Sequence, residues 1–318
     1  MKEIGGYFEL ELRKGDVFHT KAIKLNDGRN GLEYVLRAKK FSKLYLPYFV
    51  CEVVLQPPTK LNIEYEFYNV DLNLDPVFDK KIGENEAFLY VNYFGLKQKT
   101  VEKLKKSIPN LIIDSTQAFF QMPYKNTDTF YSARKFFGVA DGGFLYTDKL
   151  LDKSFDIDIS YKKMQHLLQR IEEGAPSAYK LFIQADDDLD YNDIEQMSKL
   201  TLRILQNVDY EKVKSTRETN FKYLHSKLGK INDLSIVNAR LNGPMYYPFL
   251  IKDDSIRNHL IKNKIYVPTY WPNTFKWCSE NSTEYYLAKY ILPLPIDQRY
   301  DLLAMQRIIE VMKEIKIG

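Results

Sequence analysis

The 318-residue sequence predicts an α/β fold: a mostly parallel central sheet flanked by helices, followed by a smaller α+β C-terminal domain. Over the first two-thirds of the chain, short apolar runs alternate with helical patterns, which is typical of βαβ units. From residue 160 onward the pattern changes to helices with few strands. No internal repeat or low-complexity linker separates the two parts. We therefore expect a large domain over residues 1–208 and a small domain over 209–318.

In the first part, the predicted strands are short and apolar. They lie at residues 44–46, 63–70, 87–92, 111–114, 130–132 and 144–147. The run AFLYVN does not alternate with polar residues, which indicates a strand that is buried on both faces. Two helices are predicted between the strands, one over 28–40 after an Asn-Asp-Gly turn and one over 98–108 with an amphipathic pattern.

The second part is mainly helical in its pattern. Helices are predicted over residues 161–173, 193–207, 210–230, 254–263 and 301–315, and strands over 246–251 and 266–267. The stretch GAPSAYKLFIQADDDLD, residues 174–190, is predicted to be irregular.

Composition excludes several classes of function. The 46 basic and 42 acidic residues are interspersed, so no basic stripe for nucleic acid is expected. The two cysteines and four histidines show no metal-ligand spacing, so no metal site is expected. No apolar run reaches the ~18 residues that span a bilayer, and the N-terminal residues lack the apolar core of a signal peptide. We therefore expect a cytoplasmic protein without a membrane partner.

Two polar residues stand directly after predicted strands, where open parallel sheets bind their ligands. Asp114 ends the apolar run LIID, and its carboxylate either meets a cationic partner or caps the next helix. Lys135 precedes the apolar stretch FFGVA and then Asp-Gly-Gly. A solvated surface lysine is the ordinary alternative, but a lysine held among aromatic side chains is desolvated, which favours the nucleophilic amine.

The region around these residues resembles the active site of the DegT/DnrJ/EryC1/StrS family of sugar aminotransferases. That family has a strand-end D-x-x-Q-A, a serine-containing strand, a Schiff-base lysine and an acidic-Gly-Gly turn. The matching residues are Asp114, Gln117, Ala118, Lys135, Asp141, Gly142 and Gly143. The segments GRNGLEYVLRA, LYLPYFVCEVV, VNYFGL, YPFLIKDD and AKYILPLPID resemble further family segments, so the resemblance covers most of the chain.

The resemblance implies fold type I and the cofactor pyridoxal 5′-phosphate. Lys135 would carry the cofactor as a Schiff base and then shuttle a proton. Asp114 would pair with the pyridinium nitrogen and Gln117 would lie near the phenolic oxygen. Phe49 or Tyr48 would stack on the ring.

The phosphate would bind at the N-terminus of the first helix, to Gly28, Arg29 and Asn30. Phe130 stands where the family usually has its serine, so the hydroxyl is expected from Ser132, which lies on the same side of the strand. The family's intersubunit G-x-N-x-R segment has no clear counterpart, because DDDLDYNDIEQMSKLT occupies its place.

The function implied is transfer of an amino group from glutamate to a nucleotide-linked keto-sugar, in the synthesis of surface polysaccharide or another glycoconjugate. Arg29, Arg134 and Asn92 are the candidates for the donor carboxylate. The family builds its site at a two-fold interface, so we expect a homodimer. A dehydratase-like reaction on the same fold and a non-catalytic family member stay open as alternatives; the lysine that known dehydratases lack is present.

Overall fold

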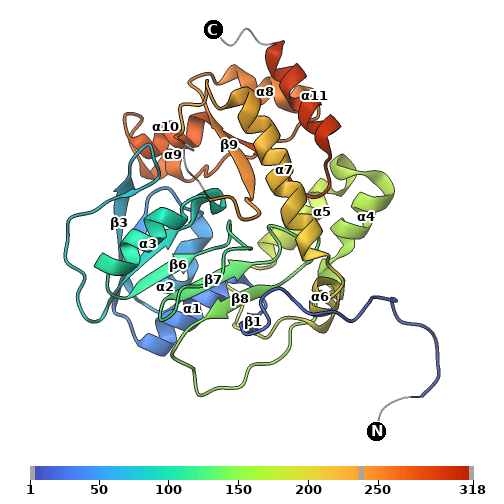
Figure 1. Cartoon of the computed structure of the whole chain (residues 1–318). Coiled ribbons are helices and arrows are strands. Elements are labelled where there is room, and N and C mark those ends of the chain that lie inside the picture. Colours follow the sequence, from blue (N-terminus) through green and yellow to red (C-terminus); the bar gives the residue numbers. More distant parts are fainter. Residues whose placement is uncertain (1–3, 236–239, 315–318) are drawn as a thin grey trace.

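The computed structural model describes residues 4–235 and 240–314, and an eight-stranded sheet forms its centre (Figure 1). Its strands lie in the order β1-β8-β7-β6-β5-β2-β3-β4. The bounds are β1 Ile23–Leu25, β2 Lys43–Pro47, β3 Glu64–Val70, β4 Pro76–Val77, β5 Glu86–Val91, β6 Leu111–Asp114, β7 Asp128–Ser132 and β8 Gly143–Tyr146. Neighbouring strands from β3 through β2, β5 and β6 to β7 run parallel, and β1, β4 and β8 pair antiparallel. The predicted mostly parallel sheet is confirmed.

The helices of this part follow from local sequence signals. They are α1 Gly28–Lys39, α2 Gln56–Lys60, α3 Gln98–Ser107, α4 Gln165–Glu173, α5 Ala175–Asp187 and α6 Lys199–Leu205. α1 begins where the side chain of Asp27 accepts a hydrogen bond from the Arg29 backbone N–H, and it ends at Lys40 in the left-handed conformation. α1 packs on β7 and β8, so its N-terminus lies close to the ends of these strands.

The C-terminal part contains a two-stranded antiparallel sheet, β9 Tyr246–Leu250 with β10 Ile291–Pro295. Its helices are α7 Tyr210–Leu228, α8 Ser255–Lys262, α9 Thr274–Trp277, α10 Thr283–Tyr290 and α11 Leu302–Lys313. α7 packs on β9 and on α11. One hydrophobic cluster continues from the large sheet into this part, joining, for example, Phe88 to Phe221 and Met305. The expected boundary between residues 208 and 209 stays a prediction.

One predicted irregular stretch and one predicted helix are wrong. Residues 174–190 were predicted to be irregular, but Ala175–Asp187 form α5, because Gly174, at a φ of 86°, makes the turn after α4 and Pro176 fits the first turn of the next helix. Residues 193–198 are extended instead of helical. The Asn26 backbone N–H donates to the Glu195 carbonyl at 2.9 Å, and Gln196 bridges to Leu25 beside β1.

The predicted strand at 266–267 is also wrong. The guanidinium of Arg257 donates to the carbonyls of Val267 and Pro268, so a side chain takes the place of a strand partner. β10 was not predicted, because its two prolines argue against a strand. It is accommodated as one strand of an isolated pair. Among the helices that the structure describes, none is long and apolar enough to cross a membrane.

Candidate active site

A cavity of about 1730 Å³ opens at the carboxyl ends of the parallel strands, between the large sheet, the α4–α5 helices and the C-terminal part. Asp114 at the end of β6 and Ser132 at the end of β7 line it, as does Lys135 three residues later. The sheet topology therefore brings together three of the residues that the sequence singled out.

Asp114 and Lys135 meet through Thr116. Lys135 Nζ donates to Thr116 Oγ1 at 3.1 Å, and the Thr116 backbone N–H donates to Asp114 Oδ1 at 2.8 Å. Asp114 is buried, and burial raises the pKa of its carboxyl, while the positive charge of Lys135 and the bonds from Thr116 oppose this rise. A buried carboxylate favours a cationic or hydrogen-bond-donating ligand group, because such a group stabilises its ionised form.

The expected aromatic surroundings of Lys135 are only partly present. The rings of Phe136 and Phe137 turn into a second hydrophobic cluster, together with Phe119 and Phe144. The side chain of Lys135 instead extends into the cavity and is exposed there. The aromatic residues therefore fix the backbone of the lysine segment and do not desolvate its amine.

The N-terminus of α1 forms one wall of the cavity. A Cβ atom at Gly28 would lie 3.3 Å from Thr116 Cγ2 and 3.4 Å from Ser132 Cβ, so this glycine lets the helix approach both strand ends. Gly28, Arg29 and Ser132 all line the cavity. First-turn N–H groups of a helix and a serine hydroxyl are donors that suit an anion.

The Asp-Gly-Gly turn holds this wall in place. Asp141 is fully buried and accepts hydrogen bonds from the Ser198 backbone N–H (2.7 Å), from Ser198 Oγ (2.8 Å) and from Thr201 Oγ1 at the start of α6. Gly143 packs directly against the backbone of Asp27. The turn therefore anchors β8 to α6 and to the N-terminus of α1.

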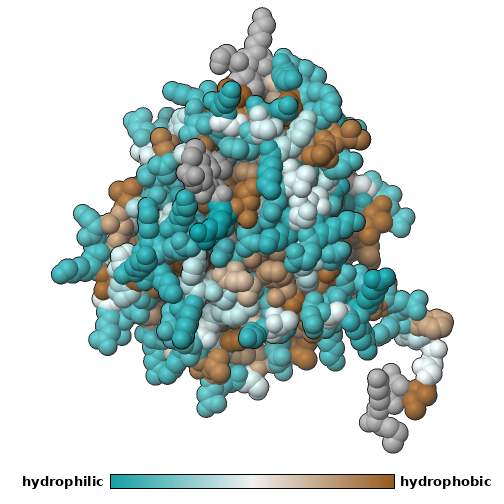
Figure 2. Space-filling model, viewed as in Figure 1, coloured by the Kyte–Doolittle hydropathy of each residue, from teal (hydrophilic) through white to brown (hydrophobic). Residues whose placement is uncertain are grey.

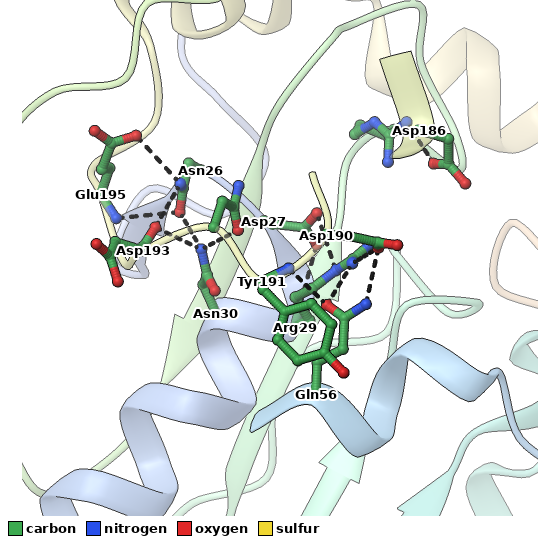
Figure 3. A network of polar contacts seen from close by, with 12 residues as sticks. Asn26, Asp27, Arg29, Asn30, Gln56, Asp186, Asp190, Tyr191, Asp193 and Glu195 are labelled. Atoms are coloured by element: carbon green, nitrogen blue, oxygen red, sulfur yellow. Dashed lines mark hydrogen bonds and ion pairs between the residues drawn. The ribbon is translucent and has the colours of Figure 1, made fainter. Parts of the chain in front are cut away.

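Asn30 does not reach the cavity. Its Nδ2 donates to Asn26 Oδ1 at 2.8 Å and to the Asp193 carbonyl at 3.0 Å, within a polar network that ties residues 190–195 to α1 (Figure 3). At the helix end Gly28 therefore lines the cavity, while the Arg29 backbone N–H is taken by Asp27 and Asn30 is engaged in the network.

Arg29 lines the cavity, but its guanidinium has protein partners. Nη1 donates to Gln56 Oε1 at 2.8 Å and to Asp190 Oδ1 at 2.7 Å, as Figure 3 shows, and Nε lies 3.5 Å from Asp27 Oδ2. The side chain is 8% exposed. Arg29 therefore links α1 to α2 and to the segment after α5.

Three predicted residues lie behind the cavity wall instead of lining it. Phe49 is buried between Tyr93 and Trp271. Gln117 Oε1 accepts from the Phe94 backbone N–H at 2.7 Å. Asn92 Oδ1 accepts from the Lys97 backbone N–H at 3.0 Å. The predicted contacts of these residues with a cofactor or donor stay predictions.

Sequence reasoning missed several residues around Lys135. Thr116 was not predicted as a site residue, although it lies two residues after Asp114 in the strand-end motif. Arg217 from α7 stacks its guanidinium 4.5 Å above the ring of Phe136, and Gln298 Nε2 donates to the Phe136 carbonyl at 2.7 Å. Both come from distant parts of the chain, so no local pattern marked them.

The fold of this chain is similar to the folds of solved sugar aminotransferases, and the expected fold is confirmed. The sugar aminotransferase CalS13 from Micromonospora echinospora is 13% identical, with 93% of this chain and 88% of that chain covered and a TM-score of 0.62. A DegT/DnrJ/EryC1/StrS aminotransferase from Brucella abortus is 14% identical, with coverages of 93% and 86% and a TM-score of 0.61.

The E. coli GDP-4-keto-6-deoxy-D-mannose-3-dehydratase, solved with hydrated PLP, has the same fold. It is 15% identical, with 91% of this chain and 87% of that chain covered and a TM-score of 0.61. No family model and no curated protein matches the sequence.

Proposed function

We propose that this chain is a pyridoxal-phosphate-dependent aminotransferase that moves an amino group from glutamate to a nucleotide-linked keto-sugar for polysaccharide or other glycoconjugate synthesis. The observation that carries the proposal is the pairing of Lys135, whose amine extends into the cavity, with the buried Asp114 beside it. The similarity of the fold to the folds of solved sugar aminotransferases also supports this proposal.

The residues of the cavity fit this cofactor. Bound pyridoxal phosphate supplies an aldehyde that accepts amines and a ring that withdraws electrons. Asp114 would hold the pyridine nitrogen, because a carboxylate excluded from water favours a positively charged N–H partner. Gly28 and Ser132 would hold the phosphate, together with the first-turn N–H groups of α1.

Lys135 would perform the proton transfer. Its Nζ is held by a single hydroxyl, that of Thr116, so it can leave this hydrogen bond and turn toward a substrate carbon. In the neutral form Nζ would take the proton from Cα of the amino donor and hold it for the return transfer. Phe136, held by Arg217 and Gln298, keeps the backbone of this segment in place.

We further propose a cytoplasmic homodimer. Large apolar side chains are exposed on α4 and α5; Leu168 (60% exposed) and Ile183 (40%) lie outside the cavity, whereas Tyr179 and Phe182 line it. Figure 2 shows hydrophobic side chains at the right edge of the molecule, where Figure 1 places α4. Such a face favours coverage by a second copy.

The test separates cofactor attachment from transamination. Purified protein supplied with pyridoxal phosphate should acquire a visible absorbance band and an adduct on Lys135 that borohydride reduces to a permanent one. Lys135→Ala should abolish both, whereas Lys149→Ala, which removes another exposed lysine, should leave both unchanged. Retention of the adduct in Lys135→Ala would overturn the assignment.

Glutamate added to the loaded protein should then yield about one equivalent of 2-oxoglutarate without any sugar, since the first half-reaction needs only the amino donor. Excess 2-oxoglutarate should reverse the spectral change. If a panel of amino donors produces no keto acid while the cofactor stays on Lys135, the dehydratase-like or non-catalytic alternative replaces transamination.

A further inference from the structure

Inside the cavity, the carboxylate of Asp186 pairs with the guanidinium of Arg134, the residue before Lys135. Arg134 directly precedes Lys135, and its Nη2 lies 2.8 Å from Asp186 Oδ1 near the end of α5. Both side chains line the cavity. The arginine side chain is 15% exposed, whereas that of the aspartate is 50% exposed. Because ion pairs with half-exposed partners are weak, another carboxylate can replace Asp186 on this arginine.

A second polar group, His166, lines the same cavity. His166 from α4 is 7% exposed, and its Nδ1 has no hydrogen-bond partner among the described residues. Burial, and then the positive charge of Arg134, lower the pKa of this imidazole, while a hydrogen bond with the Lys163 backbone opposes the fall. A buried, unpaired ring nitrogen beside a guanidinium is a ready contact for a ligand oxygen.

The other two residues that the sequence named for a ligand carboxylate are engaged. Arg29 is tied to Gln56 and Asp190, and Asn92 faces the backbone of Lys97 behind the wall. Of the three, Arg134 has the most replaceable partner.

We propose that Arg134 and His166 form a carboxylate-binding subsite, and that Asp186 occupies it until a ligand carboxylate displaces it. The inference rests on the proposed function, because it names where the carboxylate of the amino donor binds. Arg134 presents two N–H groups in the fork that matches a carboxylate, and the adjacent Lys135 then faces the donor's Cα.

Binding of glutarate tests the subsite without cofactor or turnover. Glutarate is a dicarboxylate with no amino group, so it cannot react, and calorimetry on the full-length protein measures its affinity. Asp186→Asn removes the competing carboxylate and should tighten binding about fivefold. Arg134→Met removes the fork and should weaken binding about tenfold or more, with Arg134→Lys between it and the wild type.

Asp187→Asn is the matched control. It removes the same charge at the next residue, whose side chain is exposed and forms no ion pair in the described part of the chain. It should bind glutarate like the wild type. Three results would contradict the subsite. The first is an Arg134→Met variant that is folded by circular dichroism and binds glutarate like the wild type. The others are an Asp186→Asn variant whose affinity for glutarate rises no more than that of Asp187→Asn, and a set of proteins in which none binds glutarate. Arg134-dependent binding in a protein that never attaches pyridoxal phosphate would retain the subsite and reject the proposed function.

Discussion

At the scale of single residues, Asp114 shows how a sheet prepares a side chain for chemistry. It ends a strand whose four residues are all buried, so its carboxyl is excluded from water although it borders a cavity. Burial raises its pKa, and the charge of Lys135 and the Thr116 hydrogen bonds oppose the rise. A cationic ring nitrogen against this carboxyl would stabilise its ionised form further.

Asp114→Asn should therefore bind pyridoxal phosphate but react slowly. The amide cannot stabilise a positive charge on the ring, so the proton-transfer step should lose roughly 3 kcal/mol, about a hundredfold in rate. Stopped-flow absorbance during the glutamate half-reaction measures this. A near-normal rate would mean that Asp114 serves only to accept the Thr116 backbone N–H.

His19 makes stability depend on pH. It is fully buried, its Nε2 contacts the Phe119 carbonyl at 2.8 Å, and burial lowers its pKa from 6.5 to about 4. Below pH 6.5 the unfolded chain takes up a proton that the folded chain refuses, so the free energy of unfolding falls as pH drops toward 4. The loss should approach ~3 kcal/mol.

Urea unfolding at pH 7 and pH 5 measures this loss. His19→Phe keeps a ring in the aromatic cluster but cannot titrate, so its stability should change less between the two pH values than that of the wild type. If the free energy of unfolding changes equally between the two pH values in both proteins, other groups cause the acid sensitivity.

The sequence predicted site residues where a motif is local and missed them where the fold joins distant segments. Asp114 and Lys135, which both line the cavity, were predicted because each follows an apolar strand. The engagement of Arg29 with Asp190 was not predictable, because 161 residues separate the partners. Arg217 reaches Phe136 through an equally non-local contact.

At the scale of elements, the site depends on how closely α1 approaches β8. Gly143 begins β8 against the backbone of Asp27, the residue that caps α1. Capping and close approach together aim the first turn of α1 at the cavity. The alternation of strands and helices predicted both elements, but not that this contact leaves no room for a Cβ atom.

Gly143→Ala should therefore damage stability and cofactor binding together. The new Cβ would overlap the Asp27 carbonyl and push α1 from the strand ends, lowering the free energy of unfolding by about 2 kcal/mol. Gly138→Ala is the control, because its Cβ would find Leu167 Cδ2 at an ordinary 3.9 Å. Urea unfolding and pyridoxal phosphate titration measure both effects; equal behaviour of the two variants would contradict the role of this contact.

At the scale of the whole molecule, the C-terminal part completes the cavity instead of standing apart from it. Arg217 on α7 donates to the carbonyls of Pro244 and Met245 and stacks on Phe136, the residue after Lys135. Hydrophobic periodicity predicted most helices of the C-terminal part, but not their docking on the large sheet. Periodicity identifies which face of a helix is apolar, but not the element against which that face packs.

The apolar exposure of α4 and α5 leads to the last prediction, which concerns assembly. If a second copy covers this face, the wild type should sediment as a dimer, and Leu168→Asp should shift the equilibrium toward monomer, because a buried unpaired carboxylate is costly. Leu72→Asp places the same charge at an apolar side chain that is 49% exposed in the loop after β3, and it should leave the dimer intact. Sedimentation velocity over a concentration series distinguishes these outcomes. A monomeric wild type would show that α4 and α5 are not a dimer interface, and a dimer unaffected by Leu168→Asp would place the interface on another face.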